Sequence, residues 1–422
     1  MQMKMKTKAV AAGGNLLVIE PMGAGGELLL RAVRRQGFRS VVATTDVVYR
    51  NSHAPVADLI DDLLFVDFSR PDEAVTNLVR TNKTYAYEGV VVGWEFLTEV
   101  AAVVAFELGL VGPDPSLARA RRNKLAMVTR WSECGAPVPR LQAVLTPDGV
   151  RPRGLHYPLV VKPAENSGSF GVSVVEDDSG LGQATSDAAA WTNETPHGMA
   201  LDRSVLIQDY VPGEEFSVEA VSDRGLFFAW GVTKKFTTFG RGRAETGHVF
   251  PAAISDGLRD SILSVAERGA RALAVTDGIS HTEVKLDAHN RPTLIEMGPR
   301  PAGDFIPRLV ELATGQSPVD VYVNQAAGHL PNGIAVSRAR QAAGIQFFRP
   351  EVSGTLVSLD FPASLVGAEI VERRLTCQPG ETVAPGMTNV ERLGWAIVTA
   401  DSSDEVVCAL AELRDRTRIC IL

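Results

Sequence analysis

The sequence predicts a mixed fold, in which a doubly wound α/β domain is followed by α+β units built on antiparallel strands. Three observations lead to this prediction. Short apolar runs alternate with amphipathic helical patterns up to about residue 115. Strands joined by turns with Gly, Pro and Asp dominate the middle of the chain, and short strands precede one closing helix at its end. We therefore expect four units, over residues 1–115, 116–205, 206–335 and 336–422.

The composition is that of a soluble globular protein without nucleic-acid or membrane partners. The 422 residues are 45% apolar and 22% charged, with a net charge of -8. An acidic chain of this kind does not match a nucleic-acid binder. The most apolar long stretch, residues 90–110, carries Glu95, Glu99 and Glu107, which a membrane span would not. Four scattered cysteines indicate free thiols in a reducing cytoplasm, with Cys134 packed in the core.

The first unit is expected to hold four parallel strands, over residues 16–19, 40–43, 63–66 and 89–92. Residues 21–26 are expected to form a tight glycine-rich loop, and residues 27–36 an amphipathic helix. A dinucleotide phosphate can bind at such a loop before a helix N-terminus. Because full GxGxxG spacing and a ribose-binding acid after the second strand are missing, a dehydrogenase is disfavoured, while substrate binding at the loop stays open.

A lysine at the end of an apolar strand marks the second unit. Lys162 ends the strand at residues 157–162, and residues 164–171 form a loop of mostly small residues before the next strand. Backbone N–H groups of such a loop can close on phosphate oxygens. A loose β-hairpin with a snorkelling lysine explains the same pattern. Upstream, Ser116 is expected to cap a helix over residues 117–134, which carries Lys124.

Two acidic residues on adjacent strands give the main chemical signal. Glu283 and Glu296 lie in apolar strands that are joined by a turn at residues 287–292. A carboxylate buried among apolar residues requires a compensating cation, and Mg²⁺ takes carboxylate oxygens while it keeps sites for phosphate. Arg300, just beyond the second strand, offers a fork of donors for an anion. An ordinary surface hairpin with two solvated glutamates is the alternative.

Taken in order, these features resemble the ATP-grasp superfamily of carboxylate-amine ligases, and within it the bacterial L-amino acid ligases that make dipeptides. The resemblance rests on Lys162 and its loop, the strands around Gln208 and Glu215, the pattern Glu245-x-x-His248 and the acidic hairpin. It covers essentially the whole chain. It implies an ATP-grasp fold with a doubly wound N-terminal domain, two α+β subdomains that sandwich the nucleotide, and a C-terminal α+β subdomain.

The resemblance also implies site residues, with ATP and two Mg²⁺ ions as cofactors and Mn²⁺ as a substitute. Glu283 and Glu296 would hold the metal ions. The nucleotide would be bound by Lys124, Lys162, Ser167, Gly168, Ser169, Gln208, Tyr210, Val211, Glu215, Lys235 and Arg241. The amino-acid substrate would be bound by Glu245, His248, Arg300, Gly303 and Asp304, and the first three of these would also act in catalysis.

Two positions depart from the family pattern. Many ATP-grasp enzymes have Asn two residues after the second metal-binding glutamate, where this chain has Gly298, a change that the dipeptide ligases tolerate. At Asp304 a relative with a narrow pocket carries a large aromatic residue. This departure implies a roomier or more polar pocket, and hence a different substrate.

The implied activity joins two amino acids at the expense of ATP, with ADP and phosphate as the other products. A carboxylate attacks the γ-phosphate to give an acyl phosphate, and a free amine then displaces phosphate to form the amide. A ligase that activates another carboxyl, such as the side chain of glutamate, and a noncatalytic ATP-binding regulator of the same fold are the alternatives. Partners would be amino acids or amino-acid-like small molecules, and related ligases are often homodimers.

Overall fold

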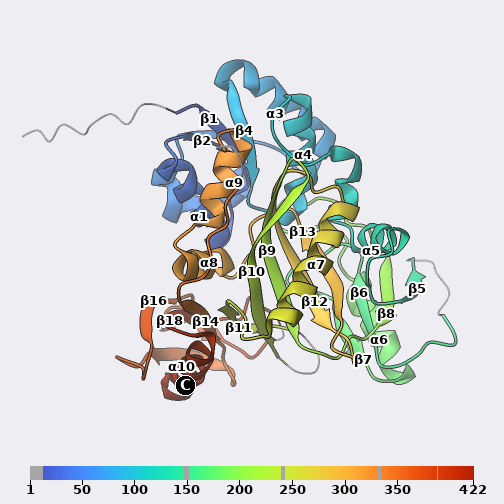
Figure 1. Ribbon diagram of the computed structural model, residues 1–422, viewed down its shortest axis with the longest axis vertical. Helices are drawn as coiled ribbons and strands as arrows, with labels where there is room; N and C mark the ends of the chain where they lie inside the picture. Colours follow the sequence, from blue (N-terminus) through green and yellow to red (C-terminus); the bar gives the residue numbers. More distant parts are fainter. Residues whose placement is uncertain (1–12, 147–151, 239–242, 331–333, 387) are drawn as a thin grey trace, which may run out of the picture.

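A parallel sheet of four strands forms the N-terminal part of the protein. The computed structural model describes residues 13–146, 152–238, 243–330, 334–386 and 388–422, and Figure 1 shows their arrangement. The strands stand in the order β3-β2-β1-β4 and pair in parallel. The four predicted strands are confirmed as β1 (Asn15–Ile19), β2 (Arg39–Thr44), β3 (Asp62–Phe65) and β4 (Tyr87–Val92).

Helices cover both faces of this parallel sheet, so its central strand has no solvent side. One face packs against α1 (Gly23–Arg35) and α9 (Pro318–Ala326), the other against α3 (Pro71–Tyr85) and α4 (Thr98–Glu107). The short α2 (Asp46–Val48) follows β2. Leu16 and Leu17 are both fully buried although they point to opposite faces. The predicted doubly wound domain is therefore confirmed in its architecture.

The glycine-rich stretch after β1 differs from its prediction as a tight loop. Helix α1 begins at Gly23, and Gly26 donates its backbone N–H to the carbonyl of Met22. A Cβ atom at Gly26 would come within 1.9 Å of the Pro21 carbonyl oxygen. Gly26 thus allows the helix to start close against the end of β1, and substrate binding at this helix N-terminus stays a prediction.

A four-stranded antiparallel sheet and two helices lie between residues 124 and 209, so this part of the fold extends beyond the expected boundary at residue 205. The strand order is β5-β8-β6-β7, and the elements are β5 (Leu141–Leu145), β6 (Leu159–Pro163), β7 (Ser173–Val175), α6 (Asp178–Ala189) and β8 (Val205–Asp209). The helix expected over residues 117–134 is shorter: α5 spans Lys124–Glu133 and follows two 3-10 turns. Asn123, and not Ser116, caps it, by accepting the backbone N–H of Ala126.

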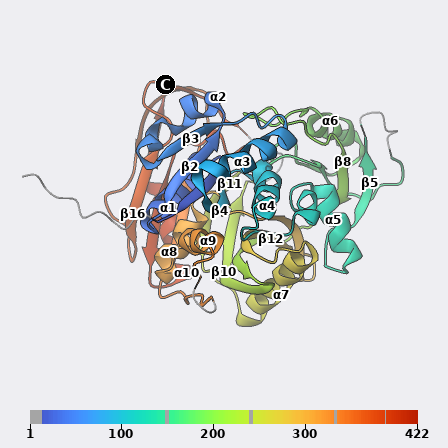
Figure 2. The same cartoon turned by 90° about the horizontal axis from the view of Figure 1, so that it is seen from above.

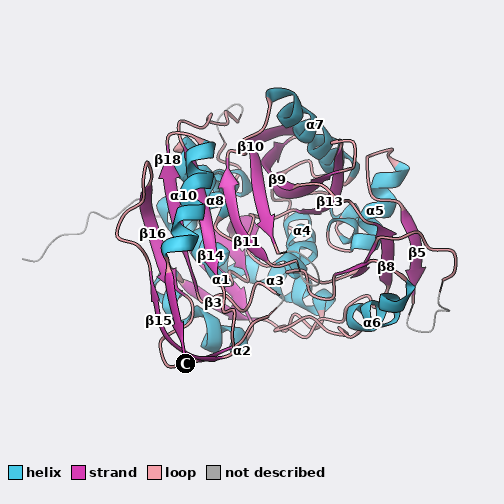
Figure 3. Cartoon of the chain, turned by 90° about the horizontal axis from the view of Figure 1, so that it is seen from below, coloured by secondary structure: helices cyan, strands magenta, loops and turns pink. Residues whose placement is uncertain are grey.

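The largest element is an antiparallel sheet of eight strands in the order β13-β12-β9-β10-β11-β14-β18-β16. Figure 3 shows most of these strands side by side from below. Five precede residue 300: β9 (Glu215–Asp223), β10 (Leu226–Thr237), β11 (Glu245–Phe250), β12 (Gly278–Leu286) and β13 (Pro292–Gly298). Three follow it: β14 (Ala342–Phe348), β16 (Glu369–Leu375) and β18 (Gly394–Ala400). One sheet thus spans the unit boundary that we placed at residue 336.

Helices pack on both faces of the eight-stranded sheet. Helix α7 (Asp256–Ala272) covers β9, β10, β12 and β13, while α9 packs on β9 and β12. At the other end, Ile397 faces α8 (Ile306–Thr314) and the next residue, Val398, faces α10 (Ser403–Arg416). This alternation is that of a strand buried on both sides. Figure 2 shows α8, α9 and α1 beside one another above the sheet.

A small sheet in the order β17-β15-β19 completes the C-terminal part. It consists of β15 (Gly354–Asp360), β17 (Thr382–Val383) and β19 (Arg418–Ile421). All four cysteines are free, as predicted, but Cys134 is exposed and not in the core, because it lies at the C-terminal cap of α5. Among the described residues, no helix has the length and apolar character needed to cross a membrane.

Candidate functional site

A cavity of about 270 Å³ collects most of the residues predicted to form the site. Its walls come from β6, β7 and β8 of the four-stranded sheet and from β9, β11, β12 and β13 of the eight-stranded sheet. The predicted residues that line it are Lys124, Lys162, Ser167, Gly168, Ser169, Gln208, Tyr210, Val211, Glu215, Glu245, Glu283, Glu296, Arg300 and Gly303. Residues remote in sequence therefore meet around one space.

Four predicted residues are not part of this lining. Lys235, His248 and Asp304 lie behind the walls, in contact with lining residues. Arg241 lies outside the described residues. Direct contact of these four side chains with a ligand stays a prediction.

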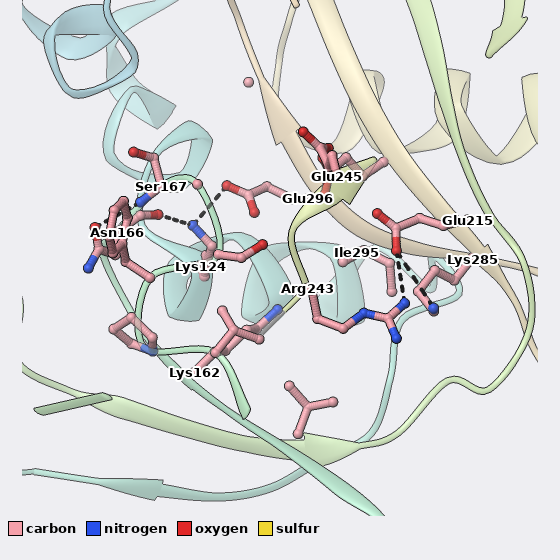
Figure 4. A pocket seen from close by; sticks show the side chains of 18 of the residues that line it. Lys124, Lys162, Asn166, Ser167, Glu215, Arg243, Glu245, Lys285, Ile295 and Glu296 are labelled. Atoms are coloured by element: carbon pink, nitrogen blue, oxygen red, sulfur yellow. Dashed lines mark hydrogen bonds and ion pairs between the residues drawn. The ribbon is translucent and has the colours of Figure 1, made fainter. Parts of the chain in front are cut away.

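Two buried lysines and a small-residue loop form one end of the cavity. Lys162 is the fourth residue of β6 and Lys124 the first of α5, and their exposed fractions are 8% and 6%. Lys124 donates to the backbone carbonyl of Asn166 in the loop and pairs with Glu296 at 2.8 Å, as Figure 4 shows. Burial lowers the pKa of Lys162 to about 8. Burial also acts to lower the pKa of Lys124, but Glu296 and Glu95 outweigh it and raise that pKa.

The two acidic residues lie on adjacent paired strands, as predicted. A β-bulge beside them also brings Ile295 to the cavity. Glu283 of β12 and Glu296 of β13 are direct cross-strand partners. The register shifts after Glu283, so that Val284 pairs with Leu294 and Ile295 is the extra residue of a β-bulge. As a result Ile295 and Glu296, which are adjacent in sequence, both line the cavity.

Each of the two facing carboxylates has a lysine partner. Glu296 pairs with Lys124, and Glu283 accepts a hydrogen bond from Lys235. Burial alone would raise the pKa of Glu283, but Lys235 and His281 hold it well below its usual range. Burial raises the pKa of Glu296, because Glu95 and Glu283 add like charge and Lys124 only partly compensates. Glu283 is thus ionised near neutral pH.

These carboxylates fit a hard divalent cation. Glu283, Glu296 and Glu95 line the same cavity, and burial of like charges at close range is unfavourable without a cation. Their oxygen ligands are the type that Mg²⁺ and Mn²⁺ prefer. The lysine partners of Glu283 and Glu296 supply positive charge at the same place. The residues predicted to hold the metal ions therefore fit that group.

The residues expected to contact the base and ribose lie near the end of β8 and the beginning of β9. Gln208, Tyr210 and Val211 follow one another along β8 and the connection after it. Gln208 is 2% exposed and donates to the carbonyl of Pro139 at 3.4 Å. Glu215, at the start of β9, lies 3.6 Å from a guanidinium nitrogen of Arg243 and 3.7 Å from the ammonium of Lys285, both visible in Figure 4.

A cluster of acids and cations forms the remaining wall, around Glu245. Glu245 Oε1 lies 2.7 Å from the ammonium of Lys235. His248 Nε2 lies 3.4 Å from Asp304 Oδ2, and His248 is fully buried. Burial raises the pKa of Glu245 to about 8, since the attraction of Lys235 is offset by the charge of Asp304. Burial lowers the pKa of His248, so its imidazole is neutral near pH 7.

Sequence reasoning missed several residues of the site. Glu95, which follows β4 in the first unit, is buried and pairs with the partly buried Arg300 in a charge-assisted contact. His281 donates toward Glu219 at 2.9 Å and lies 3.5 Å from Glu283. His281 and Glu283 are two residues apart in β12, and residues at this spacing in a strand point to the same face. This spacing could have identified His281 from the sequence. Glu95 offered no such signal, because it is remote in sequence from the acidic hairpin.

Two family models match the chain. Residues 155–308 match the ATP-grasp domain, and residues 346–421 match the L-amino acid ligase C-terminal domain 2. The first match includes Lys162, Glu215 and the acidic hairpin, and the second begins within β14.

Individual relatives are remote in sequence. The uncharacterized protein y4rH of Sinorhizobium fredii is 25% identical over 393 residues, which make up 92% of this chain and 79% of that protein. Dapdiamide A synthase of Enterobacter agglomerans is 25% identical over 319 residues, or 72% of this chain and 71% of that enzyme. The crystal structure of an L-amino acid ligase from Bacillus licheniformis superimposes with a TM-score of 0.84 at 21% identity, covering 98% of this chain and all (100%) of that chain.

Two sheets that enclose a cavity lined by lysines and a cross-strand carboxylate pair define an ATP-grasp fold. The chain carries an ATP-grasp domain over residues 155–308 and a region over residues 346–421 that matches the C-terminal domain 2 of L-amino acid ligases. It is accordingly an ATP-dependent ligase of the class that forms amide bonds.

Proposed function

We propose that this ligase joins two amino acids, by activating the carboxyl group of the first as an acyl phosphate for attack by the amino group of the second. One observation carries the proposal. A single cavity runs from Lys124, Lys162 and the glycine-serine loop, past Glu283 and Glu296, to Glu245 and Arg300. The groups expected to bind the nucleotide phosphates and the carboxylic acid would therefore face the same space.

The two lysines and the loop would hold the phosphates of ATP. A lysine ammonium is a compact charge on a flexible stem, which suits a phosphoryl group that moves during transfer. Ser167, Gly168 and Ser169 line the cavity beside Lys162, and small side chains let the backbone N–H groups approach phosphate oxygens. The same loop would exclude water, which would otherwise hydrolyse an acyl phosphate.

Glu283 and Glu296 would hold divalent ions. Mg²⁺, or Mn²⁺ in its place, neutralises the charge that develops on the transferring phosphoryl group. The chain's own contribution is to present two carboxylates from neighbouring strands toward the phosphate end, with His281 and Lys235 fixing the position of Glu283.

Arg300 is placed to bind the carboxyl group that reacts. Its side chain lines the cavity and is anchored by Glu95 and by donation to the carbonyl of Pro301 at 2.9 Å. In the first step a carboxylate oxygen attacks the γ-phosphorus and the bond to the β-phosphate oxygen breaks, releasing ADP. In the second, the amine nitrogen attacks the acyl carbon, the bond to phosphate breaks and the amine loses a proton. Arg300 would stabilise the negative oxygens in both steps.

ADP release with each amino acid alone and in every pair, followed by mass spectrometry of the products, tests the proposal. We expect ADP formation that depends on two amino acids and a product whose fragments show an α-linked dipeptide. Arg300→Ala should lower kcat/KM by about 10²- to 10³-fold, the effect of losing one oxyanion donor. Arg374→Ala, on the exposed edge strand β16, is the matched control.

Two outcomes would contradict the proposal. A γ-linked product would show that a side-chain carboxyl is activated, and the absence of ADP with any amino acid, despite ATP binding, would indicate a noncatalytic regulator. Assembly as a homodimer and a cytoplasmic location stay predictions, and light scattering of the purified protein tests the first.

A further inference from the structure

A segment of the C-terminal part reaches the wall of the cavity that is formed by Glu245. This segment, residues 388–393, connects β17 to β18. Its own contacts fix it: Thr388 donates to Glu391 through both its backbone N–H and its hydroxyl, and the Leu393 N–H donates to the carbonyl of Phe348 in β14. The segment is therefore held as part of the C-terminal fold, independently of Glu245.

Asn389 holds Glu245 at two points. The Glu245 backbone N–H donates to Asn389 Oδ1 at 2.9 Å, and Asn389 Nδ2 donates to Glu245 Oε2 at 3.0 Å. The first bond fixes the beginning of β11, and the second orients the carboxylate. Asn389 itself lines the cavity. An amide is suited to this task, because it offers one acceptor and one donor at a fixed separation.

Arg392 holds Asp304 and the backbone of Glu245 together. Its guanidinium makes a bidentate pair with Asp304 at 2.6 and 2.7 Å, and Nη2 also donates to the Glu245 carbonyl at 3.1 Å. It lies 3.5 Å from the centre of the Phe347 ring, which restricts it further. Only 11% of this side chain is exposed. A buried bidentate pair of this kind fixes both partners.

Asp304 needs such a partner for two reasons. Its backbone φ is +53°, and that of the following Phe305 is +60°, so two successive non-glycine residues adopt the left-handed conformation before α8. Its carboxylate also lies within 4.8 Å of the ligand atoms of both Glu245 and His248. Asp304 is the ionised member of this close pair of carboxyl groups, and the bidentate Arg392 guanidinium compensates its charge.

We propose that Asn389 and Arg392 are positioning residues, through which the C-terminal domain completes the amino-acid-binding end of the site. They would act through Glu245 and Asp304, to which their side chains are hydrogen-bonded. The inference rests on the proposed function, because the substrate at this end is taken to be an amino acid. It goes beyond that proposal by assigning a role at the active site to the segment between β17 and β18.

Steady-state kinetics with ATP and the amino acids varied separately will test the inference. Arg392→Ala and Asn389→Ala should each raise the KM for one amino acid about tenfold or more, the cost of leaving a buried polar group misplaced. The KM for ATP should change less than about twofold, since ATP is placed by other walls of the cavity. A general loss of structure would raise the KM for the amino acid and the KM for ATP together.

Two further variants keep the inference testable if Arg392→Ala fails to fold. Arg392→Lys retains the charge but not the bidentate fork, and should show a smaller rise in the same KM. Asn389→Ala removes no charge, so its fold should survive. Arg374→Ala, at an exposed arginine, should leave both KM values unchanged. Thermal melts will verify that all variants are folded.

The outcomes separate the two proposals. If the unmodified protein forms no amino-acid-dependent ADP, the proposed function falls and this inference falls with it. If the unmodified protein is active but folded Asn389→Ala and Arg392→Lys show unchanged amino-acid KM values, or equal changes for ATP, only the positioning role is overturned.

Discussion

Individual charged residues at the cavity are paired with residues remote in sequence, and two of the three pairs join different units. Lys124 of α5 contacts Glu296 of β13, Lys235 of β10 contacts Glu283 of β12, and Arg300 contacts Glu95 from the first unit. Each carboxylate in these pairs is buried or nearly so, and a buried carboxylate without compensation is strongly destabilising. Each of these three carboxylates therefore has a cationic partner in the structure.

Replacement of Glu296 tests the metal assignment. We expect Glu296→Ala to lower turnover by about a thousandfold, or about 4 kcal/mol at the transition state, because one of the two facing carboxylates is lost. ADP release at saturating Mg²⁺ and amino acids measures this, and circular dichroism should show an unchanged fold. Glu369→Ala, on the exposed edge strand, is the control. Retained activity would remove Glu296 from the metal site, and EDTA should stop the unmodified enzyme.

The low pKa of Lys162 predicts how ATP affinity depends on pH. With a pKa of about 8, lowered by burial, the amine is charged before ATP arrives only below that pH. Above it, binding has to take up a proton, so affinity should fall by up to about tenfold for each pH unit. Calorimetric titration with Mg·ATP from pH 6.5 to 9.5 measures this fall.

Lys162→Arg supplies the control for this prediction. Arginine stays charged throughout this range, so the variant should lose most of the pH dependence. Lys83→Arg, at an exposed position in α3, should keep it. An identical fall in Lys162→Arg would assign the dependence to other groups, such as His281 or Glu245, whose pKa values lie near 9 and 8.

At the scale of elements, a connection in the second unit is anchored on the first. Residues 190–204 link α6 to β8. Within it, His197 donates toward Glu20 at 2.7 Å and toward Glu194 at 2.9 Å, and all three are buried. Glu194 also accepts from the indole of Trp94, next to Glu95. The same connection contacts the glycine-serine loop, where Trp191 packs edge-on against Phe170. The buried network thereby links the loop to the parallel sheet.

The stability of the fold should depend on pH through this network. Burial acts to lower the pKa of His197, but hydrogen bonds to Glu194 and Glu20 raise it to about 9, above the unfolded value near 6.5. Its contribution is therefore complete below about pH 6.5 and lost as pH rises through 9, a loss of about 3 kcal/mol. Glu20, whose pKa the histidines lower against the effect of burial, contributes above about pH 4.5.

Urea unfolding at pH 6, 7.5 and 9.5 measures this loss. His197→Gln should be less stable at pH 6 and should show a smaller decline toward pH 9.5. His329→Gln, at an exposed histidine, should decline like the unmodified protein. Equal declines in His197→Gln and the unmodified protein would contradict the assignment.

At the scale of the whole molecule, the eight-stranded sheet unites the middle and C-terminal parts. β14 pairs with β11 from Gly247–Gln346 through Phe250–Ala343, and β11 begins at Glu245 in the site. The C-terminal strands are thus continuous with the sheet that carries the acidic hairpin. The position of Glu245 in the cavity wall is therefore linked to the C-terminal strands through the pairing of β11 with β14.

Removal of residues 336–422 should prevent folding of the remainder. The deletion exposes the long edge of β11 and the apolar faces of α8 and β11 that β14 and β18 cover. An unpaired apolar edge promotes aggregation. We expect insoluble or aggregated protein by size-exclusion chromatography, where the full chain gives one peak and one calorimetric transition. A soluble, cooperatively folded fragment would show that the two parts are separate folding units.

Much of the local structure follows from the sequence. Apolar runs without polar alternation specify β1, β2 and β4, because strands covered on both faces need no solvent side. The turn at residues 287–291, with Asn290 at a φ of +57°, sets the pairing of β12 with β13 and so brings Glu283 opposite Glu296. The lysines, the loop and the acidic pair are all local signals of this kind.

Tertiary structure alone decided the rest of the site. Glu95, Asn389 and Arg392 come from segments far from the acidic hairpin, and their roles depend on how separate units pack. The bulge at Ile295 and the helical start at Gly23 result from steric fit between neighbouring backbones. Sequence patterns record which residues prefer burial or a turn, whereas the partner of a buried charge is set by long-range contacts. For this protein the sequence determined most of its strands, its class and the facing carboxylates Glu283 and Glu296, and the tertiary structure decided which remote charges pair with the residues of that cavity.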